Sequence, residues 1–514
     1  MSSAPLSALS AGVTLQPGPH AQIPVVAPFT GSVLGAIPAC SAPDIEFAVA
    51  RARAAQPGWS RRSFAERARI FLRFHDLLLR RQNEVLDLIQ LENGKARRHA
   101  FEEILDTAVV TRYYALRAGR LLRPRRRKGA LMLLTRTWEL RYPLGVIGFL
   151  VPWNYPLNLA ISDAVPALLA GNTAIIKPDP QTSFTALWAV QLLREAGLPP
   201  DACCVVTGEG PVAGPPLIQH ADYVMFTGST QTGKLVAQQA AERLIGCSLE
   251  LGGKNPMIVR ADADLNAAVE GAIAGCFAGA GQVCVSIERI YVHDSLYPRF
   301  LPKFAERAKA LCLGSALDYS VDMGSLTSER QLQRVQEHVL DALEKGATLV
   351  AGGRRRPDLG PLFYEPTVLT GVRPGMKLYA EETFGPVVSV YSFAADTEAI
   401  EKANDTPYGL NASIWTRDTR AAARLARSIQ TGSVNVNESY AAVWGSVDSP
   451  MGGWKQSGLH PRHGADGILK FTKAQTVAVQ RLLPIGPPPG IDPGFHARYM
   501  TRLVQLLRRV RILG

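Results

Sequence analysis

Short apolar runs and longer stretches with helical spacing alternate along this chain. Residues 62–118 carry apolar side chains every three or four positions among charged ones, which predicts helices. Four later apolar runs each end in a loop and precede a helical stretch, at 145–151, 173–178, 203–208 and 223–228. Such strand, loop and helix units, at a spacing of about 25 residues, are typical of a doubly wound parallel sheet. These sheets bind ligands at the carboxyl ends of their strands.

The same alternation restarts at Asn255 and continues to about Val436, which predicts a second α/β domain. Before the first sheet, residues 131–141 form a β-like stretch that follows a basic run and suggests a hairpin arm. Residues 484–493 are rich in proline and predict a rigid linker. The final stretch, 495–513, has apolar residues at helical spacing with five arginines interleaved, which predicts a basic amphipathic helix.

Length and charge narrow the classes of protein. A chain of 514 residues with 47% hydrophobic residues predicts two or three packed units and excludes disorder for most of its length. The formal net charge of +12 is confined to two segments. Residues 117–128 hold seven basic residues and no acid, and residues 481–514 carry a net charge of +5, so the rest of the chain is neutral. We therefore expect no nucleic-acid partner.

Cysteine usage and the absence of targeting signals predict a soluble cytoplasmic protein. The seven cysteines form no CxxC pair and no metal-ligand spacing with histidine, which is typical of reduced thiols and predicts no metal site. The first basic residue is Arg51, so residues 1–50 lack the features of a signal or transit peptide. Residues 144–162 are uncharged but are interrupted by two prolines and an asparagine, which favours a buried strand and loop over a membrane span.

Three residues could carry chemistry. Cys284 follows small residues in GAGQVC, although a lone cysteine is more commonly an inert buried side chain. Glu250 ends an apolar strand, where burial would raise its pKa toward that of a useful base; the alternative is an ion pair with Lys254. Asn154 follows a buried strand, where its amide could donate to an oxyanion or merely form a turn.

Two further segments suggest a nucleotide. In FTGSTQTGK (226–234) a strand leads through Gly228 to Gly233 at the start of a helix, which offers backbone N–H groups and the helix dipole to a pyrophosphate. The spacing is not that of the GxGxxG fingerprint, so this signal alone is modest. Lys177 ends another strand and could reach a ribose or phosphate; its alternative is a solvated loop lysine.

With these features in this order, the chain resembles the aldehyde dehydrogenase superfamily over roughly residues 25–480. The shared motifs are PWNYP (152–156), IIKP (175–178), FTGS (226–229) with Gly233, LELGGKNP (249–256), GQVC (281–284), EETFGPV (381–387), NDTPYGLNAS (404–413) and PMGGWKQSG (450–458). The resemblance is closest to bacterial NADP-using succinate-semialdehyde dehydrogenases, through KPDPQT (177–182), SVDMGSL (320–326), GPLFYEPTVLT (360–370) and RHG (462–464).

The resemblance implies a mechanism for three residues. Cys284 would attack the aldehyde carbon as a thiolate, and the oxyanion would be held by the Asn154 side chain and the Cys284 backbone N–H. Hydride transfer to the nicotinamide would leave a thioester that Glu250 helps water to hydrolyse. The implied activity is NAD(P)-dependent oxidation of an aldehyde, with succinate semialdehyde the favoured substrate and a neutral aliphatic or aromatic aldehyde the alternative.

The resemblance also implies the domain plan and the cofactor residues. Residues 1–120 and 142–252 would form the cofactor domain and 253–465 the catalytic domain. Residues 121–141 and 466–484 would form an arm for a homodimer or homotetramer, followed by the basic extension 485–514. The residues expected to position NADP, or NAD, are Trp153, Lys177, Gly208, Phe226, Gly228, Ser229, Gly233, Glu382 at the nicotinamide ribose and Phe384 beside the ring.

Two positions depart from the pattern of the family. NAD-preferring members often carry a glutamate three residues after the lysine, where this chain has Pro180, so we expect NADP to be used at least as well as NAD. Well-known succinate-semialdehyde dehydrogenases carry two arginines for the substrate carboxylate, and here those positions hold Ser162 and Ala278. Either another basic residue replaces them or the substrate is a neutral aldehyde.

Other readings of the sequence stay open. A family member could use phosphate or coenzyme A as the acyl acceptor, but the presence of Glu250 favours hydrolysis. A non-catalytic protein that works through its basic arm or tail is a further alternative, which intact Cys284, Glu250 and Asn154 disfavour. For the terminal helix, packing on its own subunit or on a neighbour is favoured over peripheral membrane contact.

Overall fold

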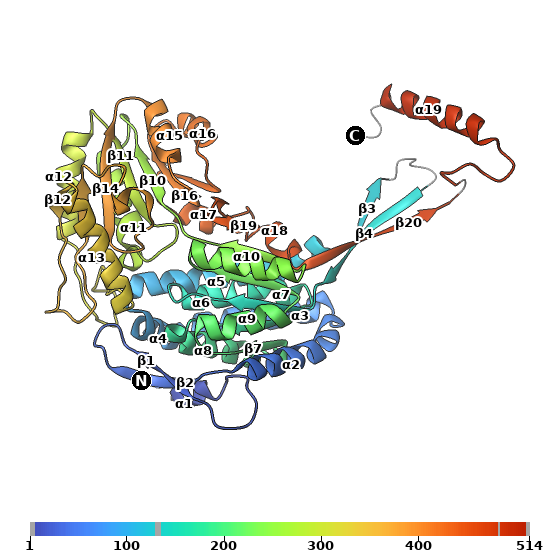
Figure 1. Ribbon diagram of the computed structural model, residues 1–514, viewed down its shortest axis with the longest axis horizontal. Helices are drawn as coiled ribbons and strands as arrows, with labels where there is room; N and C mark the ends of the chain where they lie inside the picture. The colour runs from blue at the N-terminus through green and yellow to red at the C-terminus, as the bar shows by residue number, and fades with distance from the viewer. Residues whose placement is uncertain (1–5, 129–134, 482–483, 510–514) are drawn as a thin grey trace.

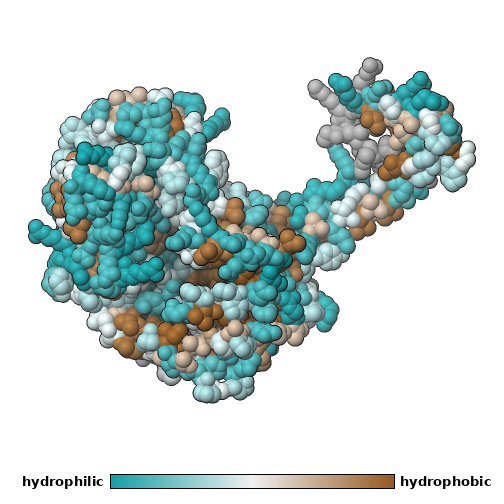
Figure 2. All heavy atoms as spheres, viewed as in Figure 1, coloured by the Kyte–Doolittle hydropathy of each residue, from teal (hydrophilic) through white to brown (hydrophobic). Residues whose placement is uncertain are grey.

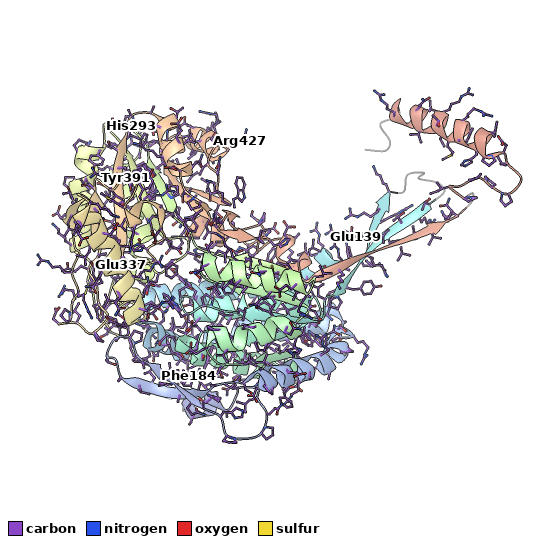
Figure 3. All side chains as sticks on the ribbon, in the orientation of Figure 1. Glu139, Phe184, His293, Glu337, Tyr391 and Arg427 are labelled. Carbon is purple, nitrogen blue, oxygen red and sulfur yellow. The ribbon has the colours of Figure 1, made fainter. Side chains whose placement is uncertain are left out.

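The chain folds into two lobes, and a narrow arm projects from the first (Figure 1). The structure, a computed structural model, describes residues 6–128, 135–481 and 484–509. Each lobe is built around a mostly parallel sheet, as the alternation of apolar runs and helical stretches predicted. Figure 3 places Phe184 in the helical layer of the first lobe and Tyr391 in the second lobe.

The sheet of the first lobe has six strands in the order β19-β9-β8-β5-β6-β7. Its bounds are β5 Val146–Leu150, β6 Thr173–Lys177, β7 Cys203–Val205, β8 Tyr223–Thr227, β9 Gly246–Glu250 and β19 Gly458–Leu459. Only β19 is antiparallel, and it comes from the far end of the chain to pair Gly458 with Glu250. The strand order reverses between β5 and β8, so the crevice typical of such sheets lies at their carboxyl ends.

Helices cover both faces of this sheet because the crossovers from β5 through β6 to β7 run in one direction and those from β7 through β8 to β9 run in the other. One face carries α2 Ala42–Ser60, α9 Gly210–His220 and α10 Thr230–Glu242. The other carries α3 Phe64–Arg80, α4 Gln82–Asn93, α5 Arg97–Leu122, α6 Pro156–Ile161, α7 Ala164–Leu169 and α8 Ser183–Glu195. The small elements are α1 Leu6–Ser10, β1 Gln22–Val26, β2 Val33–Pro38, η1 Pro180–Thr182 and η2 Pro200–Ala202. Almost all of α8 is buried, since it lies beneath this outer helical layer.

The sheet of the second lobe has seven strands in the order β12-β13-β14-β11-β10-β16-β17. Its bounds are β10 Asn255–Val259, β11 Ile287–His293, β12 Thr348–Ala351, β13 Thr367–Thr370, β14 Val387–Phe393, β16 Asn411–Trp415 and β17 Ser433–Val436. Its longer helices are α11 Leu265–Phe277, α12 Tyr297–Lys309, α13 Glu329–Glu344, α15 Asp396–Asn404 and α16 Thr419–Ala426. Shorter elements are η3 Ala278–Gly281, α14 Lys377–Ala380, β15 Tyr408–Gly409, α17 Ala441–Trp444, β18 Trp454–Lys455 and α18 Asp466–Leu469.

The arm is a three-stranded antiparallel sheet in the order β20-β4-β3. Its strands are β3 Arg125–Lys128, β4 Thr135–Pro143 and β20 Thr472–Gln480. The expected hairpin is present, although residues 131–134 of the predicted strand lie outside the described residues. Glu139 on β4 (Figure 3) forms ion pairs with Arg127 on the neighbouring strand β3 and with Arg141 on its own strand. Most of β20 is exposed, so the arm is not packed into the body of its own subunit.

The basic extension ends in the helix α19, Pro493–Arg509, beyond the tip of the arm (Figure 1). The predicted helix covers 495–513, of which 510–514 lie outside the described residues. Phe495, Tyr499, Val504 and Leu506 are more than half exposed, and hydrophobic and hydrophilic residues are mixed on this surface (Figure 2). Within the described ranges α19 makes no hydrogen bond or ion pair to either lobe, so the expected packing on its own subunit is not found there. Among the described residues no helix is long and apolar enough to cross a membrane.

Candidate active site

The site is assembled where the first lobe meets the second, and Asn154 is its link to the first sheet. Asn154 lies in the loop after β5 and is 5% exposed. Its backbone oxygen accepts a hydrogen bond from Lys95 Nζ at 2.6 Å, which fixes the loop. Its side-chain Nδ2 donates to the carbonyl of Gln282 at 3.1 Å. The amide therefore reaches across to the loop that carries Cys284.

Cys284 lies in a tight loop between η3 and β11. Gly279, Ala280 and Gly281 have φ values of 55°, 56° and 71°, a left-handed backbone that favours glycine and small residues. The carbonyl of Cys284 accepts a hydrogen bond from Asn255 Nδ2 at 2.8 Å. A Cβ atom on Gly253 would lie 2.6 Å from that carbonyl, so the glycines after Glu250 let β9 end against the cysteine loop. This explains the small residues of the GAGQVC segment.

Glu250 is the base candidate, and its surroundings disfavour its charge. It is 6% exposed, and its Oε1 has no hydrogen-bond partner among the described residues. Burial raises the pKa of Glu250 to about 8, against the opposing effect of Arg462 and Lys470. The alternative pairing with Lys254 is not found, because Lys254 Nζ lies 2.5 Å from Glu288 Oε2.

Cys284 is protonated in this resting site. Burial raises the pKa of the Cys284 thiol to about 12, and the nearby carboxyl groups of Glu250 and Glu382 contribute to the increase. Arg462 acts in the opposite direction. A thiol in this state needs a base to become a nucleophile, and Glu250 is close enough to influence its ionisation.

Lys177 and the loop after β8 lie along the carboxyl edge of the first sheet. Lys177 is 6% exposed and burial lowers its pKa, so it is not the solvated loop lysine of the alternative. Ser229 caps α10, where its Oγ accepts from Thr232 N–H at 3.2 Å. The sequence suggested free backbone N–H groups in this loop. The amide of Gly228 is not one of them, because it donates to the Glu250 carbonyl at 3.0 Å. A Cβ on Gly233 would collide with Leu251, so this glycine lets α10 pack closely on β9.

The end of this carboxyl edge that lies toward Cys284 holds Glu382, Phe384 and Trp153. Glu382 Oε1 accepts from Gly253 N–H at 2.8 Å, and burial raises the pKa of Glu382 to about 8. Phe384 has a φ of 57° and meets Trp153 edge-on with ring centroids 5.5 Å apart. Gly208, with φ 142°, and Phe226, whose ring contacts Gly228, lie at the ends of the neighbouring strands.

These residues fit a dinucleotide. A buried lysine and the start of α10 suit its phosphates, and a buried carboxylic acid with two aromatic rings suits a nicotinamide riboside beside Cys284. No described side chain forms an ion pair with Lys177, so its charge remains available to a phosphate.

The wall around Cys284 contains residues that the sequence did not single out. Tyr155 and Tyr440 pack in the same apolar cluster as Cys284. Their hydroxyls donate to Glu102 at 3.0 and 3.2 Å. Burial raises the pKa of Glu102 to about 6. Tyr155 belongs to the PWNYP motif and could have been found there, whereas Glu102 lies on α5 with no local signal.

The two positions that lack the expected arginines are both buried. Ser162 is buried and accepts a hydrogen bond from Asn158 Nδ2 at 2.7 Å. Ala278 is buried in the cluster around Cys284. A cavity of about 640 Å³ lies beside these elements, between α5 and the segment after α17, and Arg112 and Arg117 are among its lining residues. Its one acid, Asp448, accepts from Tyr113 at 2.6 Å.

Comparison with known proteins gives matches over almost the whole chain. The sequence model of the "Aldehyde dehydrogenase family" matches residues 16–477. A protein of Mycolicibacterium smegmatis named "Putative succinate-semialdehyde dehydrogenase [NADP(+)]" is 50% identical over 487 residues, which cover 95% of this chain and 94% of that protein. The crystal structure of succinate-semialdehyde dehydrogenase from Burkholderia pseudomallei superposes with a TM-score of 0.86 at 35% identity, covering 90% of this chain and 95% of that one. The crystal structure of PnpE in complex with nicotinamide adenine dinucleotide gives a TM-score of 0.87 at 34% identity and covers 91% of this chain and 96% of that one.

Proposed function

The chain belongs to the aldehyde dehydrogenase family, and from that premise we propose that it oxidises succinate semialdehyde to succinate with NADP. The observation that carries the proposal is the meeting of Asn154, Cys284 and Glu250 in one buried site at the carboxyl edge of the first sheet. NAD is the second candidate cofactor, because a structural neighbour was solved with it.

Cys284, Asn154 and Glu250 each have a separate role in the oxidation of the aldehyde. Cys284 loses its proton to the carboxylate that faces it, Glu250, and its sulfur adds to the aldehyde carbon. The oxygen that becomes negative is held by Asn154 Nδ2 and the Cys284 N–H, which are fixed before the reaction. A dinucleotide held by Lys177, Glu382 and Phe384 would supply the acceptor for the hydride of the aldehyde carbon. Glu250 passes the thiol proton on to solvent and is then free to take a proton from water. The water oxygen attacks the thioester, the Cys284 sulfur leaves as a thiolate with release of the carboxylic acid, and Glu250 returns its proton to that sulfur.

The preference for NADP is proposed from the residues after Lys177. Pro180 stands where a carboxylate would oppose a 2′-phosphate. The nearest acid, Asp179, accepts from Gln181 N–H at 3.0 Å and so caps its own turn. Steady-state kinetics with both cofactors test the proposal, and a strong preference for NAD would overturn it.

We propose the substrate from the names of the relatives and from the positive charge of the cavity between α5 and the segment after α17. The relatives at 50% identity are named for succinate semialdehyde, and Arg112 and Arg117 line the cavity beside the site. The positive charge of these two arginines attracts an anionic aldehyde. A panel of aldehydes compared by kcat/KM tests this, and neutral aldehydes that outperform succinate semialdehyde by a large factor would refute it.

The acyl acceptor is proposed to be water, because Glu250 can take a proton from an attacking water, and a water-activating base is needed only for hydrolysis. The alternatives, phosphate and coenzyme A, are tested by adding each to the assay and identifying the product. A non-catalytic protein is excluded if the Cys284→Ala variant loses aldehyde-dependent reduction of NADP.

We also propose a cytoplasmic homodimer or homotetramer held together by the arm. All seven cysteines are free, which suits a reducing compartment. The exposed strand β20 is an open edge that a second subunit can cover. The helix α19 continues from this arm with its apolar side chains exposed, and we assign it to a neighbouring subunit. Analytical ultracentrifugation of the full chain and of a chain ending at residue 484 tests the assignment, and vesicle binding without a change in mass would overturn it.

A further inference from the structure

A buried arginine that no step above uses lies between the elements that carry the base and the nucleophile. Arg462 is 8% exposed. It follows β19, whose Gly458 pairs directly with Glu250. Its backbone exchanges two hydrogen bonds with Met451, at 2.7 and 2.8 Å. Met451 packs in the cluster that contains Val283, Val285 and Cys284. The position of Arg462 is therefore fixed by the strand that pairs with Glu250 on one side and by the cluster around the cysteine loop on the other.

Asp163 matches the charge of Arg462 only in part. Its Nη2 lies 3.0 Å from Asp163 Oδ2, and Lys470 Nζ lies 3.3 Å from the other oxygen of the same carboxylate. The side chains of all three residues are less than 10% exposed. Two buried cations thus share one carboxylate. Asp163 stays ionised, because Arg462 and Lys470 outweigh the effect of burial and lower its pKa.

The other groups that face Arg462 are one carboxyl group, one histidine and one tyrosine. Burial raises the pKa of Asp106 to about 6, and Arg462 opposes that rise, so this carboxyl group is mostly ionised at pH 7 and offsets the second cation. Burial and the neighbouring Arg462 lower the pKa of His463 to about 3, so this ring is uncharged near neutral pH. Tyr114 donates its hydroxyl to the Gly464 carbonyl at 3.1 Å and carries no charge. Arg462 is therefore neutralised by two carboxyl groups shared with Lys470, and it is the cation that most strongly opposes the raised pKa values of Glu250 and Cys284.

Several buried polar atoms around Arg462 and Glu250 have no hydrogen-bond partner among the described residues. Nε and Nη2 of Arg462 are buried without a hydrogen-bond acceptor, since the ion pair with Asp163 does not have hydrogen-bond geometry. Oε1 of Glu250 is buried without a donor. Oδ1 of Asp106 and both ring nitrogens of His463 are also buried without a partner. Unsatisfied buried polar atoms are rare and costly, so the free N–H groups of Arg462 are available to a carboxylate oxygen such as that of Glu250.

We propose that Arg462 is a positioning residue for thioester hydrolysis, whose free guanidinium N–H groups stabilise the Glu250 side chain when it is a carboxylate, directly or through one water. The proposal rests on the assignment of Glu250 as the base. Its physical basis is that an ionised carboxylate in a buried site is favoured by a nearby cation and by hydrogen bonds to its charged form. Arg462 does not touch the substrate in this account.

Two variants separate this role from a structural one. Arg462→Gln removes the charge and keeps a polar side chain, and Asp163 is not left unpaired because Lys470 remains beside it. Arg462→Lys keeps the charge and serves as the matched control. The readout is the decay of the acyl-enzyme in single turnovers from acid to alkaline pH. Succinate semialdehyde and butanal, its neutral analogue of the same chain length, are both used as substrates. Thermal unfolding of each variant reports folding.

Arg462→Gln should move the acidic limb of the decay profile up by about one pH unit, so that decay at pH 7 slows about tenfold and recovers at alkaline pH. Arg462→Lys should keep the wild-type limb, and both aldehydes should respond alike. A limb that does not move, or a loss confined to KM for succinate semialdehyde, would overturn the proposal, the latter by pointing to contact with the substrate carboxylate. If Arg462→Gln does not fold, Arg462→Met, which also removes the charge, should show the same displaced limb, and an unmoved limb in that variant would overturn the proposal. Failure of the wild-type chain to oxidise either aldehyde would instead refute the proposed function.

Discussion

Replacing Glu250 by glutamine removes the base from the site while keeping the size of its side chain. Glu250 ends β9 and is almost fully buried, with Gly228 N–H bound to its backbone carbonyl. The amide of glutamine cannot take a proton from water, so the thioester on Cys284 should persist. The backbone contacts of β9 do not depend on the carboxyl group, so the fold should be retained.

The size of the effect follows from the pKa of Glu250, which burial raises to about 8. With that pKa roughly a tenth of the base is ionised at pH 7, half at pH 8 and nine tenths at pH 9, so hydrolysis by the wild type should rise about tenfold between pH 7 and pH 9. At pH 9 the Glu250→Gln variant should hydrolyse the thioester roughly 10²–10⁴-fold more slowly, the usual contribution of a positioned base. Its rate should not follow the wild-type titration.

The assay is rapid mixing of enzyme, NADP and aldehyde with detection of NADPH and of the acyl-enzyme by mass spectrometry. The variant should release about one NADPH for each active site and then slow sharply, because the thioester accumulates. The rise to that amplitude can itself be slower, since Glu250 also takes the thiol proton. A steady-state rate at pH 9 within a few fold of the wild type, or no trapped acyl group on Cys284, would refute the assignment of Glu250.

Four further changes test other parts of the account. Cys284→Ala should abolish aldehyde-dependent NADPH formation, and activity that survives would exclude this thiol as the nucleophile. Asn154→Ala should lower kcat roughly 10²–10³-fold through loss of one oxyanion donor, measured by steady-state kinetics, and a change in KM alone would contradict this role. Pro180→Glu should move the ratio of kcat/KM values toward NAD by at least about tenfold, because a carboxylate then opposes the 2′-phosphate. Ending the chain at residue 484 should lower the mass of the assembly or its stability in ultracentrifugation without changing kcat, and an unchanged assembly would separate α19 from the oligomer.

Much of the fold followed from local patterns. The buried strands β5 and β6 are continuous apolar runs, and the helix α8 between the sheet and an outer helical layer is apolar on most of its surface. Local sequence also placed Asn154 after a buried strand, Glu250 at the end of a strand and Cys284 after a run of small residues. The order of the strands and the return of β19 to pair with Glu250 depend on contacts distant in the chain, which no periodicity records.

Pairings between charged groups were the hardest part of the site to predict. Lys254 is four residues from Glu250, yet its partner is Glu288, because both lie beneath the loop that carries Thr383 and Phe384. The amide of Gly228, expected to be free for a phosphate, is used by the sheet instead. Arg462 belonged to a short motif of the resemblance, but only the packing of β19 and Met451 shows that it lies beside the base.

The central claim, NADP-dependent oxidation of succinate semialdehyde, is tested most directly by kcat/KM for a panel of aldehydes with each cofactor. The account predicts the highest value for succinate semialdehyde with NADP, and a value with NADP at least equal to that with NAD. Neutral aldehydes preferred by a large factor, or reduction of NAD alone, would contradict it.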